Sequence, residues 1–170
     1  MLEISKDLSL LYKLTQPWNF LTPAFELRPI ALDMIALMYK KEGFGLSANQ
    51  VGLPYSFFCM RGQSADFFII NPRIVDAKGE LVDDLEGCLS YPGLGIKQKR
   101  WLEVRLRFAG LDGQTRTQVF KGLTSRVVQH EMNHLEGVPW WHVSKLKFDI
   151  AKKKAHGRGW DYSHIPYKGI

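Results

Sequence analysis

The chain has 170 residues, of which 45% are hydrophobic and 24% charged, as in an ordinary globular protein with one core. It has no apolar run near the ~18 residues that a membrane span requires, and Glu3 and Asp7 make its N-terminus unlike a secretory signal. Its two cysteines exclude a disulfide scaffold and suit a reducing compartment, so we expect a cytoplasmic protein, or one in a host cytoplasm or organelle stroma if phage-borne or organellar.

The first element predicted along the chain is a helix over residues 29–42. Apolar side chains recur there at three- and four-residue spacing, and Gly43 is a natural stop. A loop rich in glycine and asparagine follows, up to residue 54. Its glycines lack the Gly-Lys-Ser/Thr ending of a phosphate-binding loop, so phosphate binding is not predicted. The plain structural interpretation is a helix C-cap followed by a strand.

Strands are predicted next, over residues 55–60, 67–75, 80–85, 102–108 and 117–120. Asp112 and Gly113 mark a hairpin turn between the last two. Cys59 lies in an apolar run and is interpreted as a buried strand cysteine. Because the strands are grouped between helices, we expect an α+β fold with mixed or antiparallel strands around the helix described next.

This helix carries His130 and His134 with Glu131 between them, an HExxH pattern. Positions i and i+4 lie on one helical face, so both imidazoles can bind one metal ion, and the glutamate can take a proton from a water that the metal activates. Apolar spacing from residue 123 predicts the helix, and Gly137 its end. The alternative is a pair of histidines whose hydrogen bonds are satisfied on an amphipathic helix and which bind no metal.

A catalytic metal needs a third protein ligand and an open position. The usual downstream ligands of zinc proteases are missing, because position 140 is tryptophan and no glutamate follows Glu136. Cys88 lies in a glycine-flanked polar segment before the turn-like residues 91–93, and it is the best upstream candidate. A thiolate with two imidazoles suits Fe(II), Zn, Ni or Co.

Residues 143–170 carry seven lysines and arginines against two aspartates, which accounts for most of the net charge of +6. Residues 144–154 could form a short helix, whereas the glycines and proline beyond argue against further order. The basic tail is either a solvated end or a surface for RNA or the ribosome.

Three segments together resemble the peptide deformylase family: residues 43–50 (GFGLSANQ), 86–90 (EGCLS) and 129–137 (QHEMNHLEG). Their order and spacing match that family over roughly residues 20–147. The resemblance implies a catalytic domain over residues 1–147, with residues 148–170 as a basic tail of the same domain. It also implies an enzyme that hydrolyses the formyl group from formylmethionine at the start of nascent polypeptides, releasing formate.

The resemblance further implies the role of each residue. Cys88, His130 and His134 would hold the metal, most often Fe(II), and Glu131 would move the proton. Gln50, through its amide, and Leu89, through its backbone N–H, would stabilise the oxyanion. Gly45 would let the substrate backbone approach, and the methionine pocket would be lined by Phe44, Leu123 and Val127. We expect a monomer without membrane contact.

Four positions qualify the resemblance. Asn133 stands where the family usually has aspartate, and Ser47 where it most often has alanine; both exchanges should be tolerated. Gly95 stands where some family members have an arginine, and Lys97, Lys99 or Arg100 could supply the positive charge of that arginine. Arg126 either packs its stem and extends its head to solvent, which we favour, or alters the pocket rim. Two other functions remain open: a zinc endopeptidase and an inactive metal-stabilised binding protein.

Overall fold

The computed structural model describes residues 1–141 and 145–164. Within them, five antiparallel strands form one sheet in chain order. The strands are β1 (Gly45–Ser47), β2 (Phe57–Met60), β3 (Phe67–Cys88), β4 (Tyr91–Ala109) and β5 (Thr115–Lys121). This arrangement confirms the expectation of helices combined with an antiparallel sheet.

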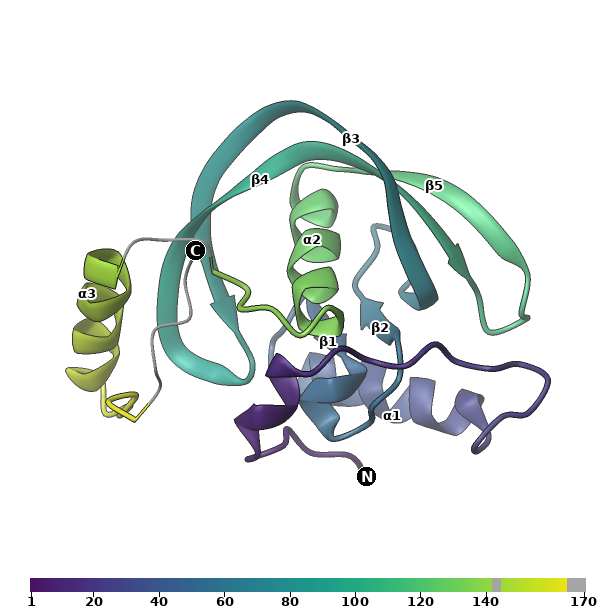
Figure 1. The fold of residues 1–170 in the computed structure, drawn as a ribbon, viewed down its shortest axis with the longest axis horizontal. Coiled ribbons are helices and arrows are strands. Elements are labelled where there is room, and N and C mark those ends of the chain that lie inside the picture. Colours follow the sequence, from purple (N-terminus) through teal and green to yellow (C-terminus); the bar gives the residue numbers. More distant parts are fainter. Residues whose placement is uncertain (142–144, 165–170) are drawn as a thin grey trace.

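The helices are α1 (Leu27–Lys40), α2 (Leu123–Leu135) and α3 (Lys145–His156), with short 3-10 turns η1 (Leu8–Tyr12) and η2 (Ala48–Val51). The long strands β3 and β4 curve over α2, whereas α1 lies below the sheet and α3 lies outside β4 (Figure 1). The short turn η2 contacts α2, and Cys88 at the end of β3 lies close to the two histidines of α2.

Helix α1 begins two residues earlier than predicted and ends at Lys40. Pro29 is accommodated in the first turn, where backbone N–H groups have no partner inside the helix. The left-handed residue after the helix is Glu42, with φ 58°, and not Gly43. Gly43 instead leaves space for Leu89, because a Cβ there would lie 2.7 Å from Cδ1 of that side chain.

The predicted strands 67–75 and 80–85 are parts of one continuous strand, β3. Gly79 adopts φ 85° at an irregularity in the pairing with β4, so it bends the strand instead of ending it. The turn predicted at residues 91–93 is also wrong. Tyr91 pairs with Cys88, which leaves a two-residue turn at 89–90, because the Tyr91 side chain is buried at 1% exposure and anchors the start of β4.

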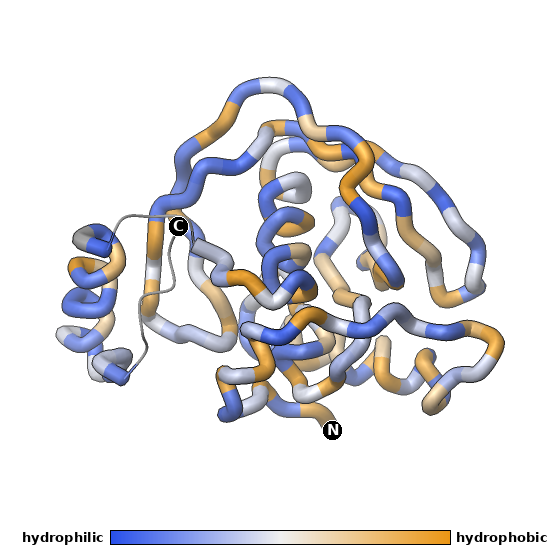
Figure 2. The backbone as a smooth tube through the Cα atoms, in the orientation of Figure 1, coloured by the Kyte–Doolittle hydropathy of each residue, from blue (hydrophilic) through white to orange (hydrophobic). Residues whose placement is uncertain are grey.

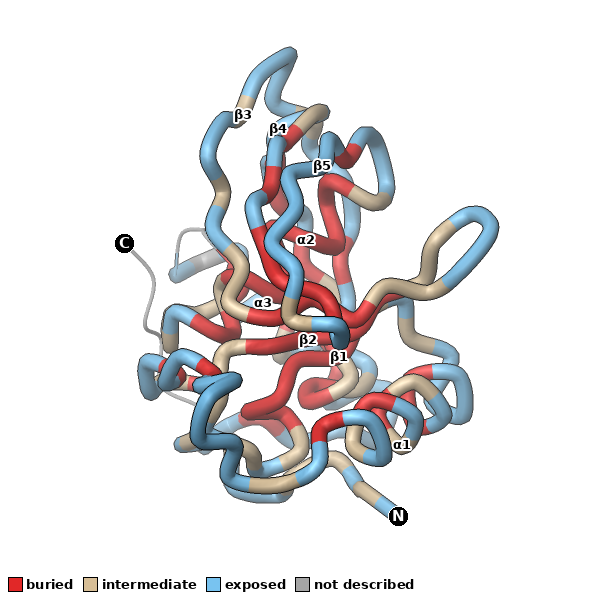
Figure 3. The backbone as a smooth tube through the Cα atoms, turned by 90° about the vertical axis from the view of Figure 1, so that its right-hand side faces the viewer, coloured by how far each residue is buried: buried red, intermediate tan, exposed pale blue. Residues whose placement is uncertain are grey.

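Helix α2 is buried along most of its length (Figure 3). The apolar side chains of Val128 and Met132 pack under the sheet against Leu106, Phe108 and Phe120. Buried and exposed residues alternate along much of β4, as expected for a strand with one buried face, and both long strands carry apolar and polar segments (Figure 2). Each fully buried aliphatic side chain contributes on the order of 1.5–3 kcal/mol, so this packing fixes the position of α2.

The C-terminal segment is more ordered than the sequence predicts. On α3 the apolar residues Phe148, Ala151 and Ala155 are buried and pack against β4 and the Trp140–Trp141 pair. Beyond the helix, the Tyr162 hydroxyl donates to the carbonyl oxygen of Pro92 at 2.6 Å. The short helix predicted over residues 144–154 is confirmed by α3 from residue 145 onward, but its apolar stripe at helical spacing was not predicted among the lysines. Residues 142–144 and 165–170 lie outside the described part.

None of the helices in the described residues is long and apolar enough to span a membrane.

Candidate metal centre and active site

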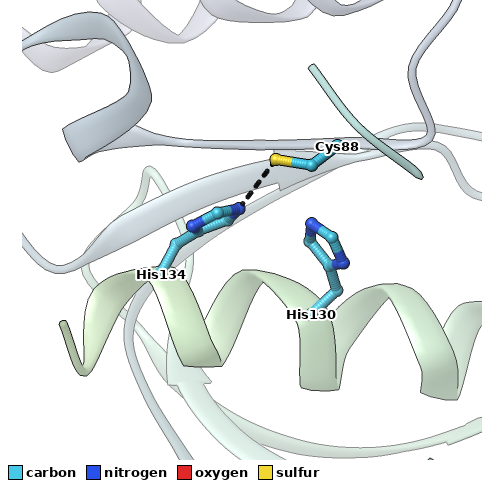
Figure 4. Close-up of side chains that lie close together, drawn as sticks. All are labelled: Cys88, His130 and His134. Atoms are coloured by element: carbon cyan, nitrogen blue, oxygen red, sulfur yellow. Dashed lines mark hydrogen bonds between the residues drawn. The ribbon is translucent and has the colours of Figure 1, made fainter. Parts of the chain in front are cut away.

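Cys88, His130 and His134 meet in one buried cluster, although Cys88 comes from the end of β3 and the histidines from α2 (Figure 4). One ligand atom from each lies within 4.8 Å of the other two. The Cys88 thiol is 3.2 Å from Nε2 of His134. Among the described residues this is the one group of its kind, and it is the set that the sequence predicts.

His130 is oriented by Glu86. Its Nδ1 lies 3.0 Å from a carboxylate oxygen of Glu86. Burial alone would raise the pKa of Glu86, but hydrogen bonds from His130 and Arg100 lower it to about 2. The carboxylate is therefore ionised and can only accept, so Nδ1 of His130 carries the proton and Nε2 presents a lone pair to Cys88 and His134.

The side chains of Cys88, His130 and His134 carry no charge in the absence of a bound ion. Burial raises the pKa of the Cys88 thiol and lowers those of both imidazoles, so all three groups are neutral on their own. Nδ1 of His134 is buried and finds no hydrogen-bond partner among the described residues. A thiol and two neutral imidazoles that converge in this way fit a divalent cation, which would stabilise the thiolate.

Glu131 lies beside the cluster at 3% exposure. Burial raises its pKa to about 8, although a contact with Ser47 opposes the shift. One of its carboxylate oxygens has no hydrogen-bond partner in the described structure. The other occupies the space in front of Gly45, where a Cβ would lie 2.5 Å from it. Gly45 is therefore required by Glu131 itself, in addition to any approach of a substrate.

Gln50 places its amide at the same site. Its Nε2 lies 3.4 Å from the sulfur of Cys88 and 3.0 Å from the hydroxyl oxygen of Ser90. Leu89, in the turn between β3 and β4, lines the adjoining cavity. Gln50 and Leu89 thus both border the space in front of Cys88 and His130.

A cavity of about 390 Å³ opens onto the cluster. All four residues predicted for substrate binding line it, together with Cys88, His130, Glu131 and Gln50. Val127 is 8% exposed and forms a deep wall, whereas Phe44 and Leu123 are about half exposed and form the rim. The predicted substrate residues are Gly45, Phe44, Leu123 and Val127.

Arg126 does not extend its head to solvent, so the interpretation favoured from the sequence is wrong. The side chain is buried, and Nη1 donates to Glu86 at 2.7 Å and to the carbonyl of Gln98 at 3.0 Å. Nη2 donates to the carbonyl of Val82 at 2.7 Å. Because the curve of β3 and β4 supplies these acceptors from distant positions in the sequence, helical spacing alone could not reveal them.

Arg100 is likewise unavailable to replace the charge missing at Gly95. It is 5% exposed and forms a two-pronged ion pair with Glu86, both N–O distances being 2.9 Å. Its Nη1 also donates to the side-chain oxygen of Asn133 at 2.6 Å. Asn133 therefore keeps this hydrogen bond to Arg100 but contributes no negative charge. Glu86 is the buried carboxylate that Arg100 and Arg126 share.

The contacts of Glu86, Asn49 and Ser90 at the site were not predicted from the sequence. Glu86 directly precedes the Gly-Cys pair, and a buried acid two residues from a candidate ligand could have signalled an orienting partner. Asn49, whose amide donates to the backbone carbonyl of His134 at 2.6 Å, left no comparable signal.

Comparison with known families and proteins gives a consistent result. Residues 2–148 match the family model described as "Polypeptide deformylase". A peptide deformylase of Wolbachia pipientis wMel is 35% identical over 144 residues, covering 76% of this chain and 80% of the relative. One of Afipia carboxidovorans is 38% identical over 135 residues, covering 76% and 79%.

Solved structures agree. The peptide deformylase of Synechococcus elongatus, determined in complex with actinonin, superposes with a TM-score of 0.86 at 27% identity, covering 99% of this chain and 91% of the other. The enzyme of a Vibrio parahaemolyticus bacteriophage, also with actinonin, gives 0.73 at 33% identity, covering 81% and 98%.

Proposed function

This chain belongs to the polypeptide deformylase family, and we propose that it removes the formyl group from N-terminal formylmethionine with Cys88, His130 and His134 as the ligands of a divalent metal ion. The observation that carries the assignment is the convergence of these ligand atoms within 4.8 Å on a cavity that also holds Glu131 and Gln50. Three protein ligands with an open fourth side are typical of catalytic metal sites, whereas structural sites are closed.

The metal ion supplies Lewis acidity that polarises the formyl carbonyl and lowers the pKa of water at the site. The thiolate and imidazole donors suit Fe(II), our first choice, or Zn, Ni or Co. Glu131 accepts a proton as water attacks the formyl carbon, and it returns that proton to the departing amine nitrogen. The C–N bond breaks, and formate and a free α-amino group are the products.

Gln50 and Leu89 stabilise the negative charge that develops on the formyl oxygen. The Nε2 hydrogens of Gln50 and the backbone N–H of Leu89 are the donors. Removing one such donor typically lowers kcat by about 10²–10³-fold. The methionine side chain enters the cavity between Val127, Phe44 and Leu123, and Gly45 leaves room for the substrate backbone beside it.

The basic C-terminal segment is proposed to contact RNA or the ribosome, where formylated nascent chains emerge. Lys153 and Lys154 are exposed on α3, whose opposite face packs on the protein. Charge reversal of both should reduce co-sedimentation with ribosomes at low salt without unfolding the helix. Binding equal to wild type would count against this surface. A monomeric, cytoplasmic enzyme suits the same role.

The reaction is tested by formate release from formyl-Met-Ala-Ser, with protein purified without oxygen and reconstituted with Fe(II). We expect release that stops on chelation and is lost in Glu131→Ala. Glu136→Ala is the matched control, because Glu136 is exposed at the end of the same helix and does not line the cavity. Glu131→Ala activity equal to that of Glu136→Ala would refute the role of Glu131.

A further inference from the structure

Ser47 is the last residue of β1 and is completely buried, with 0% exposure. It precedes η2, which carries Asn49 and Gln50. A buried hydroxyl must find a partner or destabilise the protein. Here its oxygen lies 3.0 Å from the side-chain oxygens of both Asn49 and Gln50.

The orientation of the Gln50 amide is fixed by the backbone. The N–H of Ser47 donates to Oε1 of Gln50 at 2.9 Å. A backbone N–H can only donate, so the amide oxygen must face it. The amide nitrogen therefore faces the other way, toward Cys88 and Ser90, where the reaction takes place.

The Asn49 amide is fixed in the same manner from the other side. Its Nδ2 donates to the carbonyl oxygen of His134 at 2.6 Å, and a carbonyl can only accept. Oδ1 of Asn49 therefore faces Ser47. The Ser47 hydroxyl therefore faces the two amide oxygens as acceptors, in addition to its contact with the Glu131 carboxylate, and it is the hydrogen-bond donor that the amide oxygens share.

We propose that Ser47 is a positioning residue that ties the Gln50 amide to Asn49, and through Asn49 to the end of α2 at His134. The hydroxyl holds the oxyanion donor in register with the metal ligands by sharing its proton between the two amide oxygens. This inference rests on the proposed function, because it assigns Ser47 an effect on the oxyanion donor of that same reaction.

The family most often has alanine at this position, so Ser47→Ala should fold. The substitution removes the hydroxyl donor from the side-chain oxygens of both Gln50 and Asn49. Oε1 of Gln50 still accepts from the backbone N–H of residue 47, whereas Oδ1 of Asn49 loses its donor. We expect kcat to fall by about 3- to 10-fold, the range for one hydrogen bond, with KM unchanged. Ser47→Thr, which keeps a hydroxyl, should recover part of the loss.

A double-mutant cycle with Gln50→Ala separates positioning from general damage. If Ser47 acts through Gln50, Ser47→Ala should cause no further loss of kcat once Gln50 is alanine. The same fold loss in both backgrounds would overturn the proposal, including the case in which Ser47 acts through Glu131. Wild-type protein without formate release would instead reject the proposed function itself.

A second cycle does not depend on activity. The free energy of unfolding is measured by denaturant for Ser47→Ala, Asn49→Ala and the double variant. Because Oδ1 of Asn49 needs the Ser47 hydroxyl, we expect Ser47→Ala to destabilise the wild type more than the Asn49→Ala protein. Additive effects would show that the two side chains are not coupled and would contradict the proposal.

Discussion

At the scale of single residues, Glu86 is the common hydrogen-bond partner of the buried charged side chains near the site. Its two oxygens bind Arg100, Arg126 and Nδ1 of His130, all within 3.0 Å. Breaking a buried ion pair usually costs more than the pair contributes, because an uncompensated charge remains. Substitutions around Glu86 should therefore have larger effects than similar substitutions on the surface.

Arg126→Met keeps an apolar stem but removes one cation from Glu86. Since Arg100 remains, we expect destabilisation near the lower end for a broken buried pair, about 3 kcal/mol. Arg116→Ala is the control, because its pair with Asp112 is about half exposed and should contribute under about 1 kcal/mol. Denaturant unfolding of both variants checks this. Equal losses of unfolding free energy would show that the buried ion pair contributes no more to stability than the exposed one.

The pH dependence of stability follows from the same carboxylate. The pKa of Glu86 is lowered from 4.5 to about 2 in the folded protein, so the unfolded chain binds its proton first as pH falls. The stabilisation is thus complete above pH 4.5 and is lost between pH 4.5 and 2, by roughly 3 kcal/mol.

Glu86→Gln isolates this contribution. The difference in unfolding free energy between wild type and Glu86→Gln, measured from pH 7 to pH 3, should shrink as the pH falls. A difference that stays constant would show that Glu86 is not the group responsible.

The two candidate histidine ligands and Glu131 were predictable from the sequence because their spacing is local, whereas Cys88 was proposed from its own glycine-flanked segment and from the resemblance. His130, Glu131 and His134 share one helix, so their geometry follows from its periodicity. Arg126 was misassigned, although it lies on that same helix, because its partners come from β3 and β4. Which acceptors reach a side chain from distant strands depends on how the strands curve, and no local pattern records that.

At the scale of elements, the short helix predicted over residues 144–154 is present as α3, but its packing against the core was not predicted. Lysines dominate its composition, yet Phe148 is fully buried and stacks on Trp141 with ring centroids 4.9 Å apart. The strands were located well by their alternation, but their ends were not. A break between residues 75 and 80 and a turn at residues 91–93 were predicted, whereas Gly79 and Gly93 adopt positive φ inside the long strands β3 and β4.

Phe148→Ala tests whether α3 is part of the folded core. Large-to-small substitutions of a buried phenylalanine cost about 3–5 kcal/mol. Ile150→Ala on the same helix is the control, since Ile150 is 47% exposed and should lose much less. Thermal unfolding compares the two. If the Phe148→Ala protein were as stable as the Ile150→Ala protein, the result would contradict the packing of α3 on β4.

At the scale of the whole molecule, the fold brings three distant segments to one point. Residues 45–50 comprise β1 and the start of η2, Cys88 ends β3, and α2 supplies the histidines under the curved sheet (Figure 1). Each segment is recognisable in the sequence, which is why the site could be anticipated. The bonds that link the segments to one another, such as Asn49 to His134, became visible only in the structure.

The most direct test of this account measures metal content and formate release together in two cysteine variants. Cys88→Ala should lose both the bound metal and the activity. Cys59→Ala, which removes the other buried thiol, should keep one metal ion per chain and release formate. Cys88→Ala protein that retains a full equivalent of metal and wild-type turnover would contradict the assignment of the site.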